Sequence, residues 1–146
     1  MPVLSPGDHA PAIEVLACTP GRRNARLTGP GDHRGRRVVL GFLPREERAD
    51  PAFLRTLADL GAVFTFTRPV VLVASPAPWG LQAARHAGDG HLDGLVDHLL
   101  ADDRLRLAAA YGVLGPDGDC RRAAVVIDPA GTVRQVVAEL AHDEAA

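Results

Sequence analysis

Three apolar runs constrain the fold of this chain more than any other feature of its sequence. They extend from Val38 to Leu43, from Val70 to Ala74 and from Ala123 to Ile127. Continuous apolar runs of this length are typical of strands that are buried on both faces of a sheet. The sequence therefore predicts an α/β protein in which helices cover a central sheet on both sides.

Helix signals lie between these runs. Asp50 suits the N-cap of a helix and Pro51 suits its first position, while Gly61 can end it. Other helices are expected at 79–87, at 91–98 and from Leu105 to Tyr111. The remaining expectations are a short strand at 13–16, at most a hairpin and loops at 20–35, a hairpin at 123–137 and a helical turn or two in the tail. This order is thioredoxin-like, although periodicity alone leaves several α/β sandwiches open.

Composition narrows the class of protein. The 146 residues carry a net charge of −2, which provides no basic field for nucleic acid or for an anionic membrane. All 16 basic residues are arginine, so neither a Schiff-base lysine nor a P-loop lysine exists, and we expect no cofactor. No apolar run approaches the roughly 20 residues that span a bilayer, and no signal peptide is apparent. We expect one domain over 1–146 that is soluble and cytoplasmic.

Five segments along the chain resemble the peroxiredoxin family, specifically its alkyl hydroperoxide reductase C and thiol-specific antioxidant members. They are Gly7-Asp8-His9-Ala10-Pro11, the run from Arg34 to Pro44, Leu99-Leu100-Ala101-Asp102, Ala110-Tyr111-Gly112-Val113-Leu114 and the run from Arg122 to Gly131. The resemblance implies a peroxiredoxin-type, thioredoxin-like sandwich with a central mixed β-sheet and helices on both faces. It also implies a homodimer, because the family's common dimer contacts lie beside its active site.

The sequence departs from the family at the active site. The family runs Pro-x-x-x-Thr-x-x-Cys out of its first buried strand, and its cysteine reduces peroxide from the first turn of a helix. Here Pro44 matches the proline, Arg48 replaces the threonine and Pro51 replaces the cysteine. Arg122 matches the family's site arginine. The resemblance therefore implies a site that keeps its proline, its helix N-terminus and its arginine but has no nucleophile.

The first hypothesis for function is a repurposed site. Arg48 opposite Arg122 would place two guanidinium groups beside a helix N-terminus, an arrangement that binds a small carboxylate or phosphate. Pro44 and Pro51 would then line the ligand site or a site of non-peroxidase chemistry. The alternative is that Arg48 pairs with Glu46, Glu47 or Asp50 and turns to solvent.

Two further hypotheses remain open, as does whether the protein is an enzyme at all. Cys120 precedes Arg121 and Arg122, whose charges could stabilise a thiolate, so Cys120 and Arg122 are candidate catalytic residues of a thiol oxidoreductase that uses Cys18 as well. The plainer interpretation is an inert thiol at the end of a turn. The third hypothesis is a non-catalytic subunit that pairs with an active protein.

No metal site is expected. His86, His91 and His98 lack the i, i+4 spacing that presents two ligands on one helical face. His98 and Asp102 have that spacing if their stretch is helical, but we expect the histidines to be solvated at the surface. Asp102 and Asp103 are interpreted as a helix-capping pair.

Overall fold

A seven-stranded mixed sheet forms the centre of the computed structural model, which describes residues 4–19, 25–62, 68–86 and 95–137. The strand order is β2-β1-β5-β4-β3-β6-β7, with β3, β4 and β5 parallel and the other neighbours antiparallel. The strands are β1 (Val15–Cys18), β2 (Arg26–Thr28), β3 (Val38–Phe42), β4 (Val70–Ser75), β5 (His98–Ala101), β6 (Ala123–Ile127) and β7 (Val133–Val137). The three strands predicted from the apolar runs are the buried centre of this sheet.

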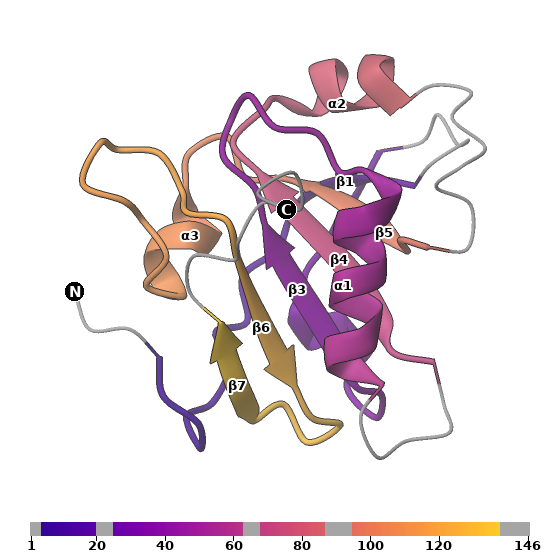
Figure 1. Ribbon diagram of the computed structural model, residues 1–146, viewed down its shortest axis with the longest axis vertical. Helices are drawn as coiled ribbons and strands as arrows, with labels where there is room; N and C mark the ends of the chain where they lie inside the picture. Colours follow the sequence, from indigo (N-terminus) through magenta and orange to yellow (C-terminus); the bar gives the residue numbers. More distant parts are fainter. Residues whose placement is uncertain (1–3, 20–24, 63–67, 87–94, 138–146) are drawn as a thin grey trace.

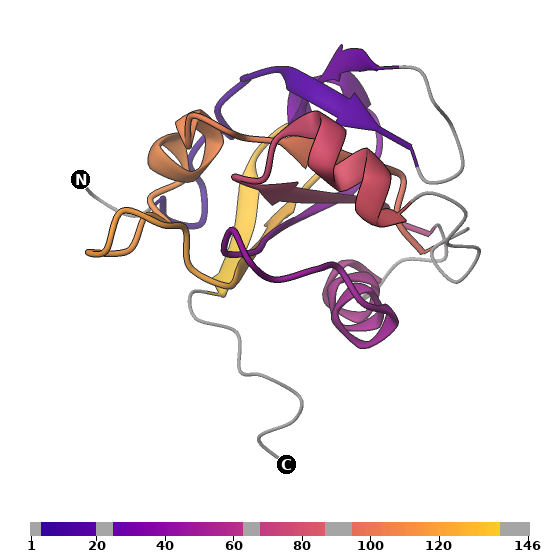
Figure 2. The same cartoon turned by 90° about the horizontal axis from the view of Figure 1, so that it is seen from above.

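Helices cover both faces of the sheet, as Figures 1 and 2 show. They are α1 (Pro51–Gly61), α2 (Trp79–His86) and α3 (Arg106–Ala110), with a 3₁₀ turn η1 (Pro30–His33) before β3. Phe53, Leu54 and Leu57 of α1 belong to an apolar cluster on one face, and Leu107 of α3 belongs with Tyr111 to a cluster on the other. The predicted fold class, a mixed sheet between helical layers, is confirmed.

Close approach of α1 to the sheet depends on Gly41 in β3. A Cβ atom at this position would lie 2.5 Å from Leu57 Cδ1 and 3.0 Å from Phe53 Cζ. A side chain there would push α1 outward, and packed cores resist such insertions. Gly41 therefore helps to fix the first turns of α1 against the carboxyl end of β3.

The start of α1 follows the predicted capping pattern. Asp50 has extended backbone geometry, and its carboxylate oxygen Oδ1 accepts a hydrogen bond of 2.8 Å from the N–H of Phe53. Pro51 occupies the first helical position, where the lack of an N–H removes no intrahelical bond. Gly61 is the last helical residue, and Ala62 is the C-cap.

Removal of this cap should weaken the fold measurably. We expect Asp50→Ala to lower the free energy of unfolding by about 1 kcal/mol, because the Phe53 N–H loses its side-chain acceptor. The midpoint of urea denaturation measures the change. Asp50→Asn is the matched control, since asparagine caps as well as aspartate; an equal loss in both variants would show that capping is not the cause.

One helix expectation was wrong. The stretch 95–98, expected to complete a helix, instead forms a turn followed by the first residue of β5. Strand β5 has only four residues and no β-branched side chain, so its local signal is weak. It forms because β4 pairs with it on one side and β1 on the other. Residues 91–94 and the expected helical tail lie outside the described residues.

Candidate functional site

The site expected from the resemblance lies where β3 ends, β6 begins and α1 starts (Figure 1). Phe42 at the end of β3 pairs with Ala123 at the start of β6, so Arg122 lies at the same end of the sheet as the loop 43–50. That loop leads directly to Pro51, which is half-buried at the first position of α1. The topology thus brings Arg122, Pro44 and Pro51 to one end of the molecule.

Arg122 is paired with a carboxylate of the chain itself. Its Nη1 atom donates a hydrogen bond of 2.7 Å to Glu47 Oε1, and its guanidinium carbon lies 4.5 Å above the centroid of the Phe53 ring. The Arg122 side chain is 12% exposed and that of Glu47 is 27% exposed. The positive charge is therefore largely neutralised by Glu47 and stacked on an aromatic face.

Glu47 is the site residue that sequence reasoning missed as the partner of Arg122. A tight turn places it there, since the carbonyl oxygen of Pro44 accepts a hydrogen bond of 3.1 Å from the Glu47 N–H. The turn-forming proline three residues earlier was the available signal. The turn at Pro44 thus places the Glu47 carboxylate beside Arg122, the arginine that the resemblance identified.

Arg48 turns to solvent, as the alternative expected, but its partner is not one of the acids expected there. Its side chain is exposed, and its Nη2 atom donates a hydrogen bond of 2.5 Å to the carbonyl oxygen of Arg85 in α2. Arg85 in turn donates from Nη1 to the carbonyl oxygen of Arg45 at 3.5 Å. The hydrogen bond of Arg48 connects the loop 43–50 to α2.

The chain's own side chains fill the space beneath this loop. A cavity of about 10 Å³ remains there, close to the smallest volume that accommodates one water molecule. Glu47 and Arg85 line it together with Ser75, Gln82 and His86. The Gln82 amide donates to the carbonyl oxygens of Ala77 at 2.7 Å and Leu100 at 3.1 Å, which links the ends of β4 and β5.

Both cysteines are buried in the core. Cys120 is 4% exposed, and its thiol donates a hydrogen bond of 2.8 Å to the carbonyl oxygen of Leu43. Burial, assisted by the negative charges of Asp119 and Asp102, raises the pKa of Cys120 to about 12. The adjacent arginines thus do not produce a reactive thiolate. Burial also raises the pKa of Cys18.

The two thiols are free and lie in different core clusters. Cys18 packs with the cluster that includes α1, and Cys120 packs with the cluster that includes α3. The sheet separates these clusters, so a disulfide between the two cysteines does not form in this fold.

The histidines are less exposed than expected. His86 is only 5% exposed, and His98 is half-buried in β5, so the expectation of solvated surface histidines is wrong for both. Because His98 begins a strand, the helical pairing of His98 with Asp102 does not exist. No group of three His, Cys, Asp or Glu side chains suited to a metal ion occurs in the described ranges.

Asp102 caps a helix, as interpreted from the sequence. Its two carboxylate oxygens accept hydrogen bonds of 2.9 Å each from the N–H groups of Leu107 and Ala108 in the first turn of α3. Asp102 is 2% exposed, whereas Asp103 is exposed to solvent. Asp102 is therefore a structural carboxylate.

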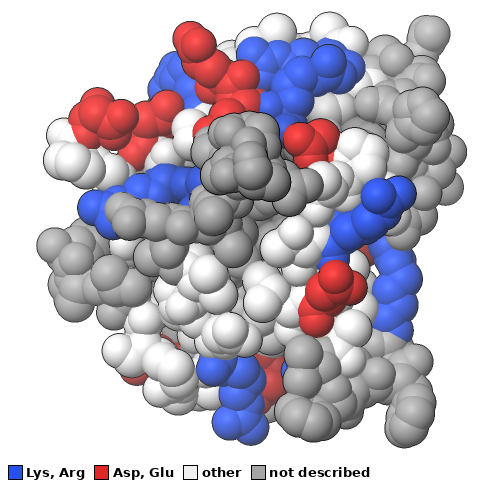
Figure 3. Space-filling view, viewed as in Figure 1, with Lys and Arg blue, Asp and Glu red and all other residues white. Residues whose placement is uncertain are grey.

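The surface near the site carries charges of both signs. On the face shown in Figure 3, arginine and carboxylate side chains lie interspersed over the described residues. This distribution agrees with the net charge of −2. Among the residues that the structure describes, no helix is long and apolar enough to cross a membrane.

The mixed sheet between helical layers is a fold that solved structures share. The chain superimposes on AhpC of Mycobacterium bovis with a TM-score of 0.78 and 24% identity, covering 97% of this chain and 85% of that one. AhpC of Mycobacterium tuberculosis superimposes with a TM-score of 0.74 and 23% identity, covering 96% of this chain and 85% of that one. The reduced 2-Cys peroxiredoxin of Plasmodium vivax superimposes with a TM-score of 0.70 and 23% identity, covering 95% of this chain and 90% of that one.

These similarities show that the chain has the fold of AhpC and 2-Cys peroxiredoxin structures. No protein-family model matches the sequence, and no curated protein matches it either. The shared fold extends over nearly the whole chain, so the loop 43–50 and Arg122 fall within it.

Proposed function

We propose that this chain is a peroxiredoxin-family protein that does not reduce peroxides and that binds a small anion at Arg122. Pro51 at the first position of α1 is the observation that carries the proposal. Proline has no sulfur to attack a peroxide, yet Arg122 remains at the same end of the sheet, half-buried and stacked on Phe53. A site without its nucleophile that keeps its cation is suited to binding.

Glu47 would occupy the anion site when no ligand is bound. Glu47 accepts from Nη1, and Arg122 Nε is buried without a hydrogen-bond partner within the described residues. A carboxylate or phosphate that engages a guanidinium through two parallel N–H donors makes a stronger contact than a single bond does. Such an anion would displace Glu47, whose side chain is 27% exposed.

Because Glu47 is attached to the chain, it competes with any external anion. The apparent affinity of a ligand is its intrinsic affinity multiplied by the fraction of molecules in which the site is open. The wild-type protein should therefore bind weakly, and a variant without the Glu47 charge should bind more tightly.

The anion site can be tested by thermal shift with inorganic phosphate and with acetate. We expect Glu47→Gln to show a larger rise in melting temperature than the wild type, because the internal competitor is lost. An anion at 100 times its Kd adds about 2.7 kcal/mol of stability, which is an easily measured shift. Sodium chloride at equal ionic strength controls for screening.

Arginine variants identify which residue binds the anion. Arg122→Ala should abolish the shift, also in the Glu47→Gln background. Arg55→Ala, at an exposed position on α1, should leave it intact, as should Arg48→Ala, since Arg48 binds the Arg85 carbonyl. If Glu47→Gln shows no anion effect, or if Arg122→Ala retains it, the anion site is wrong.

The proposal also includes a homodimer and a cytoplasmic location. The homodimer rests on the resemblance to the family, and the location rests on composition. Non-peroxidase chemistry at the Arg122 site remains compatible with this proposal, and so does pairing with an active protein.

A further inference from the structure

Two histidines meet at the end of the sheet opposite to Arg122. His33 is the last residue of η1, and His98 is the first residue of β5. Their ring centroids are 5.7 Å apart, with an angle of 34° between the ring planes. This contact joins η1, which precedes β3 in the chain, to the amino end of β5. We refer to His33 and His98 together as the histidine pair.

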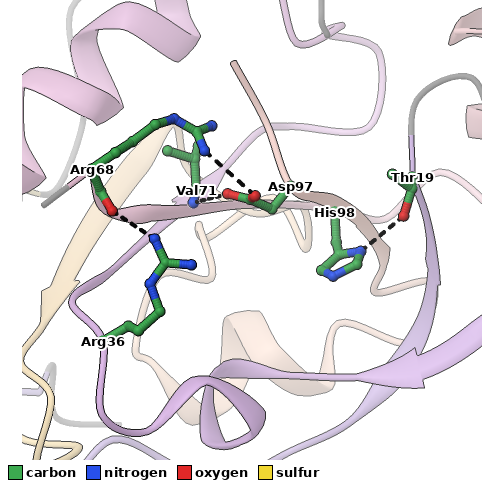
Figure 4. A network of polar contacts seen from close by, with 6 residues as sticks. All are labelled: Thr19, Arg36, Arg68, Val71, Asp97 and His98. Carbon is green, nitrogen blue, oxygen red and sulfur yellow. Dashed lines mark hydrogen bonds and ion pairs between the residues drawn. The ribbon is translucent and has the colours of Figure 1, made fainter. Parts of the chain in front are cut away.

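The polar groups near His98 form hydrogen bonds and an ion pair of their own (Figure 4). The Nδ1 atom of His98 is hydrogen-bonded to Thr19 Oγ1 at 3.0 Å, just after β1. The carboxylate of Asp97 accepts from the N–H of Val71 at 2.8 Å and pairs with Arg68 at 3.6 Å. Arg36 donates to the carbonyl oxygen of Arg68 at 2.8 Å. Asp97 is thus held by β4 rather than by either imidazole.

The surroundings of the histidine pair disfavour the protonated, positively charged form of its rings. His33 Nε2 is buried and has no hydrogen-bond partner in the described part of the chain. In an imidazolium both ring nitrogens are donors, so protonation of His33 would leave a buried N–H without an acceptor. A second charge on His98 would lie against the first at a ring separation of 5.7 Å.

The charged groups around the pair do not reverse the preference of both rings for the neutral form. Burial lowers the pKa of His33, and Arg36 and Arg26 act in the same direction, while Asp32 and Asp97 oppose them. Burial also lowers the pKa of His98, followed by the charges of His33 and Arg26, against Asp97 alone. Both imidazoles are therefore kept neutral in the folded protein more strongly than in the unfolded chain.

We propose that the histidine pair is a proton-sensitive latch that holds η1 against β5 near neutral pH and releases it on acidification. Two neutral rings pack together, whereas two imidazolium ions repel each other and the buried Nε2–H of His33 lacks an acceptor. Because η1 follows the edge strand β2, which pairs only with β1 among the described strands, its release would loosen that edge of the sheet.

The direction of the pH effect follows from linkage. A histidine whose folded-state pKa lies below its unfolded value of about 6.5 binds more protons when the chain unfolds. The contribution of the pair to stability is therefore fully present above about pH 7 and declines as the pH falls through 6.5. The decline stops below the folded-state pKa values.

The test compares urea midpoints at pH 7.5 and pH 5.5. We expect the wild-type midpoint to fall on acidification, and His33→Phe, which keeps a ring at this position, to lose more than half of that fall. His9→Gln is the matched control, because His9 is exposed, and it should retain the full fall. His86 is present in every variant, so its contribution cancels. An unchanged pH dependence in His33→Phe would overturn the proposal.

A direct titration keeps the proposal testable if His33→Phe does not fold. In the wild-type protein, the NMR shifts of the His33 and His98 ring protons should titrate below pH 6.5. On acidification, amide exchange corrected for its intrinsic pH dependence should accelerate at η1 and β2 and not at β6. Titration of both rings at or above pH 6.5 would contradict the latch.

Discussion

The purified protein should leave hydrogen peroxide and organic hydroperoxides unreduced when it is supplied with thiol reductants. The helix that begins after β3 presents Pro51 instead of a sulfur, so no covalent attack on a peroxide can start there. The two cysteines of the chain are buried, and neither lies on this helix. In a coupled assay that follows reductant consumption, turnover should equal the background without protein.

Because Cys120 is buried, we expect that its thiol does not take over the reaction. Raising the pKa of Cys120 from its ordinary value of 9.0 to about 12 leaves very little thiolate at neutral pH. The thiol proton is also engaged by the Leu43 carbonyl oxygen. Cys120→Ser should therefore give the same background rate, and peroxide turnover that this substitution abolishes would favour the thiol oxidoreductase instead.

Replacement of Asp102 by alanine should be among the most destabilising single changes in the chain. The substitution removes both acceptors of the Leu107 and Ala108 N–H groups and leaves them in a site where Asp102 itself is 2% exposed. An unsatisfied buried donor costs about 1–3 kcal/mol, so we expect a total loss of about 3 kcal/mol in the free energy of unfolding. Urea denaturation monitored by circular dichroism measures it.

The neighbouring acid provides the control for Asp102. Asp103 is exposed, and Asp103→Ala should change stability by less than about 0.5 kcal/mol. Asp102→Asn should fall between the two, because its amide keeps one oxygen as an acceptor. A loss under 1 kcal/mol in Asp102→Ala would show that water replaces the carboxylate and that the cap is not essential.

Sequence patterns predicted the parts of the fold that local physics determines. The apolar runs that became β3, β4 and β6 are unmistakable because both faces of each strand are buried. Asp50 and Pro51 marked the start of α1 through capping geometry. Strand β5 escaped detection because its four residues acquire strand geometry only from their neighbours.

The sequence also predicted only part of the candidate site. The resemblance located Arg122 and the missing sulfur at Pro51, but it did not reveal which charges pair. The loop 43–50 is held by contacts distant in sequence: the carboxylate of Asp119 accepts from the Arg45 N–H, and Arg48 donates to the Arg85 carbonyl oxygen. These contacts direct Arg48 to α2, while the turn at Pro44 directs Glu47 to Arg122, and no local pattern encodes that choice.

The burial of Cys120 was equally hidden from the sequence. The flanking arginines suggested an electropositive thiol, yet its partner is the Leu43 carbonyl oxygen, 77 positions away in the chain. Only the antiparallel pairing of β6 with β3 brings the two segments together.

The oxidation of each cysteine by hydrogen peroxide tests the central claim most directly. The folded protein is exposed to peroxide with a sulfenic-acid trap, and labelling of Cys18 and Cys120 is followed by mass spectrometry; a urea-unfolded sample serves as the reference for ordinary thiols. The account predicts that both cysteines label far more slowly in the folded protein than in the unfolded chain. Faster labelling of Cys120 in the folded protein would contradict it, because the fold would then be activating a peroxide-reactive thiol.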